Sequence, residues 1–393
     1  MSQEIVILSG ARTAFGAYGG GLASKSATEL ATIATEGALK RGNVDPQSVD
    51  YVVVGNVLQT SKDAIYMARH IALKSGMKME TPGLIINQLC GSGVQAVCQA
   101  ASLIETAQAE IVVAAGAEAL SMTPYISWGS RWGARMGHME LWDGLDIRDT
   151  FCNNSMGETA ENLQAKYQII TRQEQDKFAV RSQDLAKAAQ DAGVFADEIM
   201  PVELKDKKGK VVVIDKDEHL RAGTTMEMLA KLKPAFKKDG SVTAGNACGI
   251  VDGGASLVVT SAKTAAKLGR EPLCRVVSWT VAGVPPEIMG IGPVAAVPAT
   301  LAKAGLSLDQ IDLIEVNEAF AAQYLACEKE LKFDRAKVNV NGGAIAIGHP
   351  FGATGGRLLL SISLELKRRK ARYGLVSLCI GGGMGIAMVV ERI

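Results

Sequence analysis

The chain has 393 residues and a formal net charge of +1, from 42 Lys and Arg against 41 Asp and Glu. This balance excludes a polybasic nucleic-acid binder and an acidic tail protein. Hydrophobic residues make up 48% of the chain, which excludes intrinsic disorder and allows two or three packed domains.

Apolar β-branched runs alternate with helical patterns along the chain, which indicates a layered α/β fold. We expect strands at 5–8, 51–54, 83–87, 111–115, 256–259, 313–316, 338–341, 375–379 and 385–390. We expect helices at 27–41, 92–106, 172–192, 293–304, 318–331 and 355–369. Two uncharged stretches, 81–104 and 373–390, reach the length of a membrane span. Glycine clusters and polar residues interrupt both, so we interpret them as buried strand–loop–helix and strand–turn–strand segments.

The two ends of the chain carry related sequences. Residues 42–56 and 305–317 each follow a helix and lead into a strand that ends at Asn. The pattern Cys90-x-x-Gly opens one later helix, and His349-x-x-Gly opens another. After each of these helices comes an apolar strand that ends in glycine-rich sequence. The chain is therefore predicted to hold two copies of one α/β unit, related by a pseudo-twofold.

Residues 120–246 differ in character from both copies. They hold three of the four Trp residues, Trp128, Trp132 and Trp142, and the basic runs 205–210 and 231–238. We interpret this region as a large folded insertion that carries binding function. Its Trp segment covers a pocket, joins subunits or packs in the core. Its basic runs contact phosphates or form a solvated face.

The cysteines are seven in number, irregularly spaced and without a Cys-x-x-Cys pair. With only four His, this pattern favours neither a disulfide scaffold nor a metal site. The first residues resemble neither a secretory signal nor a transit peptide, and the last three are not a peroxisomal signal. We expect a reducing compartment, the cytoplasm, or the mitochondrial matrix if the protein is eukaryotic.

Cys90 follows a predicted strand and begins an apolar helix. The dipole and free N–H groups of a helix N-terminus lower a thiol pKa and favour a nucleophilic thiolate. A buried inert thiol is the alternative. A third reading uses Gly91-Ser-Gly93-Val-Gln-Ala96 as a dinucleotide-binding turn, with Glu118 as the acid that binds a ribose.

Three further candidate residues lie in loops or at strand ends of the second copy of the α/β unit. His349, in a glycine-rich loop, is able to accept the Cys90 proton, or it is a structural histidine. Cys379 ends a strand beside glycines. Asn317 follows a strand, where it holds a water or an oxyanion, or caps a helix. Two thiols and an imidazole at such loops predict one shared crevice.

At these residues the chain resembles the thiolases over essentially its whole length. The motifs are Asn87-Gln-Leu-Cys-Gly-Ser-Gly93, Thr243-Ala-Gly-Asn246, Asn317-Glu-Ala-Phe320, Asn339-Val-Asn-Gly-Gly-Ala-Ile-Ala-Ile-Gly-His-Pro350 and Cys379-Ile-Gly-Gly-Gly383. Within the family, residues 14–20 and 63–70 look most like the mitochondrial-type 3-ketoacyl-CoA thiolases, with short-chain acetoacetyl-CoA thiolases close behind.

The resemblance implies an α/β thiolase fold with two duplicated βαβαβαββ halves in five αβαβα layers. The first half would be residues 1–119, completed by 247–268, and the second would be 269–393. Residues 120–246 would form an inserted loop domain that binds coenzyme A. The resemblance also implies a homodimer or homotetramer.

The family pattern implies a role for each site residue. Cys90 would carry the acyl group as a thioester, and His349 would take its proton. Cys379 would move the proton at Cα of acetyl-CoA. Asn317 would hold a water that stabilises the enolate together with His349, and the N–H groups of Cys90 and Gly381 would bind the tetrahedral intermediate. The implied coenzyme A contacts are Arg221, Thr224, Cys248, Met156 and Phe320.

The implied activity is acyl transfer between coenzyme A and acetyl-CoA, by thiolysis of a 3-ketoacyl-CoA or by the reverse condensation, in fatty acid metabolism and β-oxidation. Coenzyme A and acyl-CoA would be substrates; neither a permanently bound cofactor, a metal, a nucleic acid nor a membrane span is expected. A decarboxylating condensing enzyme normally carries His in place of Cys379, and a silent acyl-CoA-binding relative would not need Cys90 and His349. Chain length, direction, subunit number and the effect of Cys248 at a usual Ser position stay open.

Overall fold

The computed structural model describes residues 3–168, 170–205 and 208–393. A mixed sheet of eleven strands runs through the molecule, and nine of these strands form its continuous path. In order across the sheet they are β15 (Leu313–Val316), β16 (Tyr373–Ile380), β17 (Met384–Glu391), β14 (Cys274–Gly283), β1 (Ile5–Thr13), β13 (Val251–Ser261), β5 (Ile111–Ala119), β3 (Tyr51–Gly55) and β4 (Gly83–Ile86). Two short strands, β10 (Ile199–Met200) and β2 (Gly16–Ala17), pair with β1 and β13.

The sheet consists of two halves that repeat one pattern, as the sequence predicts. The helices of the first half are α1 (Ala27–Gly42), α2 (Met67–Lys74) and α3 (Ser92–Glu105), and those of the second are α8 (Gly292–Ala304), α9 (Ala321–Leu331) and α11 (Phe351–Arg369). The first half runs β1-α1-β3-α2-β4-α3-β5-β13, and the second runs β14-α8-β15-α9, a bridge at Val338, then α11-β16-β17. The halves meet where β1 pairs antiparallel with β14.

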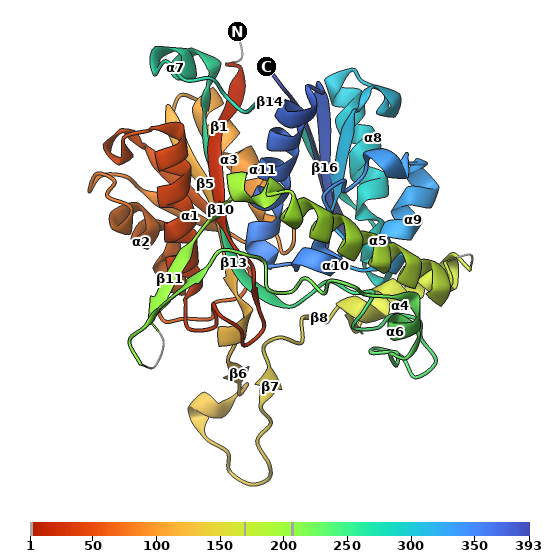
Figure 1. The fold of residues 1–393 in the computed structure, drawn as a ribbon. Coiled ribbons are helices and arrows are strands. Elements are labelled where there is room, and N and C mark those ends of the chain that lie inside the picture. The colour runs from red at the N-terminus through yellow and green to blue at the C-terminus, as the bar shows by residue number, and fades with distance from the viewer. Residues whose placement is uncertain (1–2, 169, 206–207) are drawn as a thin grey trace.

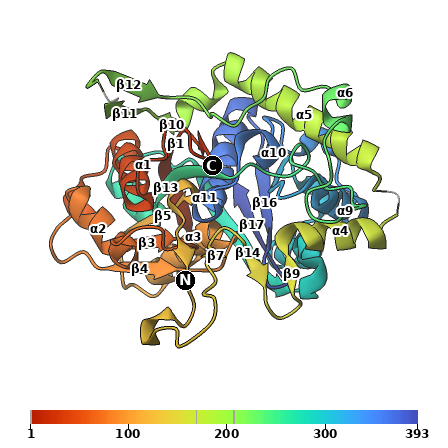
Figure 2. The same ribbon diagram turned by 90° about the horizontal axis from the view of Figure 1, so that it is seen from below.

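Five layers result from the way the helices cover these half-sheets. Helices α3 and α11 pack against each other between the halves, with α3 on β3 and β5 and α11 on β5, β13 and β16 (Figures 1 and 2). Helix α1 covers the outer face of the first half, and α8 covers that of the second. The two central helices approach closely: a Cβ on Gly93 would lie 2.8 Å from the carbonyl oxygen of Gly352.

The chain leaves the sheet after β5, rejoins it briefly where β10 pairs with β1, and returns fully in β13, the neighbour of β5. The segment between them forms β6 (Tyr125–Ile126), β7 (Trp142–Asp143), β8 (Arg148–Asp149), β9 (Asn154–Ser155), α4 (Met156–Lys166), α5 (Arg172–Asp191), β11 (Val202–Lys205), β12 (Val211–Ile214) and α6 (Met226–Ala230). Buried Arg12 on β1 ties this segment to the sheet, because its guanidinium donates to both carboxylate oxygens of Asp217 (2.7 and 2.9 Å) and to Glu198 (2.8 Å). Helices α4 and α5 pack on α9.

The β6–β7 arm projects away from the body of the molecule (Figure 1). Trp128 is 76% exposed on it and Trp132 is 89% exposed, so core packing of this Trp segment is excluded. Residues 206–207 of the predicted basic run lie outside the described residues.

Most predicted elements are present, but several differ: helices α2 and α4 were not predicted, and α11 begins at Phe351 rather than at 355. The predicted strand at 338–341 is reduced to one bridge from Val338 to Ile314. Strand β14 was missed, because polar side chains alternate along it and leave no apolar run. Helix α9 begins at Ala321 rather than at 318. The two uncharged stretches form β4–loop–α3 and β16–turn–β17, and among the described residues no helix is long and apolar enough to cross a membrane.

Candidate active site

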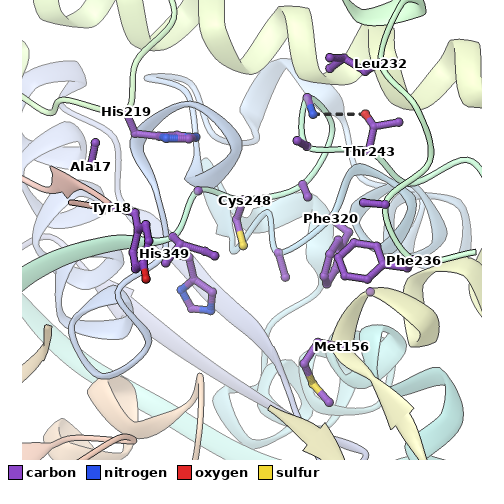
Figure 3. Close-up of a pocket in the computed structure, with 18 of the residues that line it drawn as sticks. Ala17, Tyr18, Met156, His219, Leu232, Phe236, Thr243, Cys248, Phe320 and His349 are labelled. Carbon is purple, nitrogen blue, oxygen red and sulfur yellow. Dashed lines mark hydrogen bonds between the residues drawn. The ribbon is translucent and has the colours of Figure 1, made fainter. Parts of the chain in front are cut away.

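A cavity of about 1120 Å³ lies between the inserted segment and the strand ends of both halves. This volume is at the upper end of small-molecule sites, which suits a large ligand. Its wall contains most of the candidate site residues: Cys90, Met156, Arg221, Thr224, Cys248, Phe320 and His349. Figure 3 shows Met156, Cys248, Phe320 and His349 around one open space. Of the two thiols and the imidazole predicted to share one crevice, Cys90 and His349 line the cavity and Cys379 does not.

Cys90 lies in the loop between β4 and α3. The residue before it, Leu89, has a left-handed backbone (φ 49°), and the side chain of Asn87 accepts a hydrogen bond from the Leu89 N–H at 3.0 Å. Burial raises the pKa of the Cys90 thiol to about 12, and the charge of Glu118 adds to this, while a hydrogen bond from the Gly381 N–H opposes it. The prediction of a thiolate at the helix N-terminus is therefore wrong for the resting site, because desolvation outweighs the helix dipole. Cys90 needs a base.

His349 is held in one tautomer by its neighbours. The Thr354 hydroxyl donates its proton to the Pro350 carbonyl (3.0 Å), so it accepts from Nδ1–H of His349 at 2.6 Å. Nε2 is then the acceptor, 3.3 Å from Nδ2 of Asn317. Burial lowers the pKa of the imidazole to about 3, and Arg357 contributes. The ring is neutral at physiological pH, with a lone pair on Nε2 that is able to take the Cys90 proton.

Asn317 directly follows β15 and is fully buried. Helix α9 begins only at Ala321 with Phe320 as its N-cap, so the helix-cap reading of Asn317 is excluded. While its Nδ2 donates to His349, its Oδ1 has no hydrogen-bond partner among the described residues. A buried acceptor without a protein partner fits a position that binds an ordered water.

Cys379 lies near the end of β16 and is fully buried. Cys379 is not among the residues that line the cavity. Burial raises the pKa of its thiol well above the ordinary value, and Cys90, Cys327 and Cys248 each add to this. Gly381, whose N–H reaches Cys90, follows two residues later.

The remaining wall comes from the insertion and the loop before β13. The N–H of Arg221 binds Oε1 of Gln183 at 2.9 Å, and the Thr224 hydroxyl donates to the Arg221 carbonyl at 2.7 Å. The Cys248 N–H binds the Ala319 carbonyl at 3.0 Å, and its sulfur faces the open space (Figure 3).

Sequence reasoning missed two aromatic side chains of the wall. Phe236 packs edge-on against Phe320, with ring centroids 6.0 Å apart at 87°. It also lies against Gly157, where any Cβ would collide with the ring. The ring of His219 covers Gly249 in the same way. The small residues Gly157 and Gly249 were the available signals, but nothing in a single sequence pairs them with these rings.

The dinucleotide reading of residues 91–96 is wrong. Glu118 is fully buried and accepts hydrogen bonds from the Leu58 N–H (2.9 Å) and the Gly352 N–H (2.8 Å), so it cannot reach a ribose. Gly93 serves the contact between α3 and α11 instead. The glycine spacing matches a nucleotide fingerprint because helix packing makes the same demand for small residues.

Two family models cover almost the whole chain. The model described as "Thiolase, N-terminal domain" matches residues 5–263, and "Thiolase, C-terminal domain" matches 270–392. The chain belongs to the thiolase family. The resemblance drawn from the motifs is thereby confirmed, and the protein is an acyltransferase.

Among relatives of this thiolase, the human protein named "3-ketoacyl-CoA thiolase, mitochondrial" is 48% identical over 392 residues, which are 99% of this chain and 98% of that protein. The acetyl-CoA acetyltransferase of Pseudomonas aeruginosa is 49% identical over 393 residues, 99% of this chain and 100% of the relative.

Solved thiolase structures match over the full chain. The crystal structure of human mitochondrial 3-ketoacyl-CoA thiolase in complex with CoA has a TM-score of 0.96 at 47% identity and covers 100% of this chain and 98% of its own. The crystal structure of the Bacillus anthracis acetyl-CoA acetyltransferase has a TM-score of 0.97 at 47% identity, covering 100% and 99%. The predicted thiolase fold is confirmed.

Proposed function

We propose that this thiolase transfers acyl groups through a thioester on Cys90. The observation that carries the proposal is the neutral His349, whose Nδ1–H is tied to Thr354 and whose Nε2 is left as an acceptor in the cavity that Cys90 lines. Such a base removes the thiol proton as sulfur attacks the carbonyl carbon of an acyl-CoA. The departing CoA sulfur takes its proton from the Cys379 thiol, which is left as a thiolate, while His349 keeps the proton of Cys90.

The oxyanion of that step would be bound by two backbone donors, the N–H groups of Cys90 and Gly381. The hydrogen bond from the Gly381 N–H that lowers the pKa of the Cys90 thiol supports this role for Gly381. Fixed donors in a dry site stabilise such an oxyanion strongly, because they need no reorganisation during the reaction.

In the second half-reaction, the Cys379 thiolate formed in the first step would take the Cα proton of acetyl-CoA and become a thiol again. The resulting enolate oxygen would be stabilised by Nε2 of His349, once protonated, and by a water on the unpaired Oδ1 of Asn317. The enolate carbon attacks the thioester carbon, and the bond to Cys90 breaks. The same steps in reverse cleave a 3-ketoacyl-CoA.

Coenzyme A is proposed to bind as a substrate along the inserted segment 120–246, with no permanently bound cofactor. This proposal is supported by five residues that line the same cavity: Arg221, Thr224, Met156, Cys248 and Phe320. The reacting groups at the inner end of the cavity would come from both halves, residues 1–119 with 247–268 and residues 269–393. A solved relative is described as a complex with CoA.

A homo-oligomer, a dimer or a tetramer, is proposed to form in part through the β6–β7 arm. Trp128 and Trp132 are largely exposed on it, and exposed aromatic clusters of this kind mark protein interfaces. The second copy of this chain is the proposed partner. We place the protein in the cytoplasm, or in the mitochondrial matrix in a eukaryote, since relatives include mitochondrial and bacterial proteins.

The test is single-turnover release of CoA from acetyl-CoA. The parent protein should release CoA in proportion to its sites, and Cys90→Ala should release none. Cys152→Ser, a thiol of the insertion outside the cavity wall, is the matched control and should behave as the parent. Release at the parent rate by Cys90→Ala would overturn the thioester route.

A further inference from the structure

Glu118 is a buried carboxylate that the proposed mechanism does not use. It lies on β5, and its two oxygens accept hydrogen bonds from Nδ2 of Asn56 (2.9 Å), from the N–H groups of Val57 (3.2 Å) and Leu58 (2.9 Å), and from the N–H of Gly352 (2.8 Å). Three of these donors belong to the loop after β3, and the fourth belongs to α11. Glu118 therefore joins the first half of the molecule to the central helix of the second.

One side of this junction leads to the nucleophile. Val57, held by Glu118, accepts a hydrogen bond at its carbonyl from Nδ2 of Asn87 (3.0 Å). Oδ1 of Asn87 in turn accepts from the N–H of Leu89 (3.0 Å), the left-handed residue that precedes Cys90. A left-handed non-glycine residue persists only when its surroundings hold it in place.

The other side leads to the base. Gly352 is the second residue of α11, and no side chain of the described residues next to it on the chain caps this helix, whose N-cap is Pro350. Glu118 supplies the missing acceptor from β5. In the same first turn, Thr354 binds Nδ1 of His349 at 2.6 Å.

We propose that Glu118 is a positioning residue that fixes the Cys90 loop relative to His349. The proposal rests on the roles proposed above for Cys90 and His349. Glu118 touches neither the substrate nor the reacting atoms. It acts on the rate of acylation because proton transfer from sulfur to Nε2 depends steeply on their separation, and misplacement by about 1 Å is able to cost on the order of 100-fold in rate.

Glu315 provides a matched control for a merely structural role. It is also a buried carboxylate, it also contacts α11, through Arg357 at 3.2 Å, and burial raises the pKa of both Glu118 and Glu315 to about 8. However, among the described residues the side-chain hydrogen bonds of Glu315 lead to neither the Cys90 loop nor the first turn of α11. Glu118 and Glu315 thus differ in their connections rather than in their burial.

The experiment compares Glu118→Gln with Glu315→Gln in single-turnover release of CoA from acetyl-CoA. We expect Glu118→Gln to lower the maximal acylation rate by about 10-fold or more, with the half-saturating acetyl-CoA concentration within about two-fold of the parent. Glu315→Gln should keep the rate within about two-fold even where its melting temperature falls. An acylation rate of Glu118→Gln equal to that of Glu315→Gln would overturn the proposal.

An exposed variant keeps the proposal testable if Glu118→Gln does not fold. Asn87 is exposed, so Asn87→Ala should fold, and it should slow acylation because it breaks the same chain of hydrogen bonds. In the double variant the two losses should be non-additive, since both act through one link. Additive losses, or no loss in Asn87→Ala, would contradict the proposal. If Cys90→Ala releases CoA, the thioester route fails; if it is silent while Glu118→Gln is normal, only the role of Glu118 fails.

Discussion

The two halves of the molecule place different chemistry at matching positions. Cys90 and His349 stand before α3 and α11, and Asn56 and Asn317 directly follow β3 and β15. The registers show a third pair: Glu118 opposes Gly253 across β5 and β13, and Cys379 opposes Gly385 across β16 and β17. One half thus holds the triad Asn56, Cys90 and Glu118 at the positions where the other half holds the triad Asn317, His349 and Cys379.

The triads differ in how many of their polar groups are already engaged. In the first, Nδ2 of Asn56 binds both Glu118 and the Ala117 carbonyl, so this amide is occupied. In the second, Oδ1 of Asn317 has no partner among the described residues, and Cys379 replaces the carboxylate. In the proposed mechanism, the first half mainly holds the nucleophile in place and the second half carries the acid–base groups.

Among variants of the two triads, Cys379→Ala is expected to have the largest effect, which is on proton exchange. Exchange of the Cα protons of acetyl-CoA with deuterium should fall below detection, because the group that moves the proton is gone. Acylation of Cys90 should continue, since it depends on His349. Proton NMR of acetyl-CoA in D₂O measures the exchange, and exchange at the parent rate would refute the role given to Cys379.

The next largest effect distinguishes the role of Asn317 from that of Asn56. Asn317→Ala should lower the condensation rate by about 10²–10³-fold, the usual loss for one oxyanion donor, and should leave thermal stability nearly unchanged. Asn56→Ala should instead lower the free energy of unfolding by about 1–3 kcal/mol, because buried Glu118 loses a donor. Steady-state kinetics and denaturant unfolding of both variants make the comparison. Equal loss of condensation activity in the two would contradict the division of labour.

The smallest expected effect concerns His349, whose ring should not titrate in the physiological pH range. The pKa of His349 is lowered to about 3, so its ring should stay neutral, with the proton on Nδ1, from pH 5 to pH 8. The unfolded chain binds a proton at this residue below about pH 6.5, so the stability linked to His349 is lost as pH falls from 6.5 toward 3. Imidazole ¹⁵N NMR, assigned with His349→Asn, measures the charge directly. A titration of this ring near pH 6.5 would contradict the account.

Much of the fold and site could be predicted from the sequence, because local signals coincide there with tertiary roles. The helix-opening patterns at Cys90 and His349 exposed the duplication, and the apolar runs located most strands. Strand β14 was not predicted because one of its faces is partly exposed, so that polar and apolar residues alternate along it. The protonation state of Cys90 and the proposed role of Glu118 could not be predicted for another reason. Both depend on burial and on contacts between segments far apart in the sequence, which no local sequence pattern records.

The central claim is that Cys90 carries the acyl group while His349 serves as its base. The most direct test is peptide mass spectrometry of the Cys379→Ala protein after incubation with acetyl-CoA and acid quench. The account predicts one acetyl group per active site, on the peptide that contains Cys90, and no acetyl group on Cys248. Acetyl on Cys248 with Cys90 unmodified would contradict it.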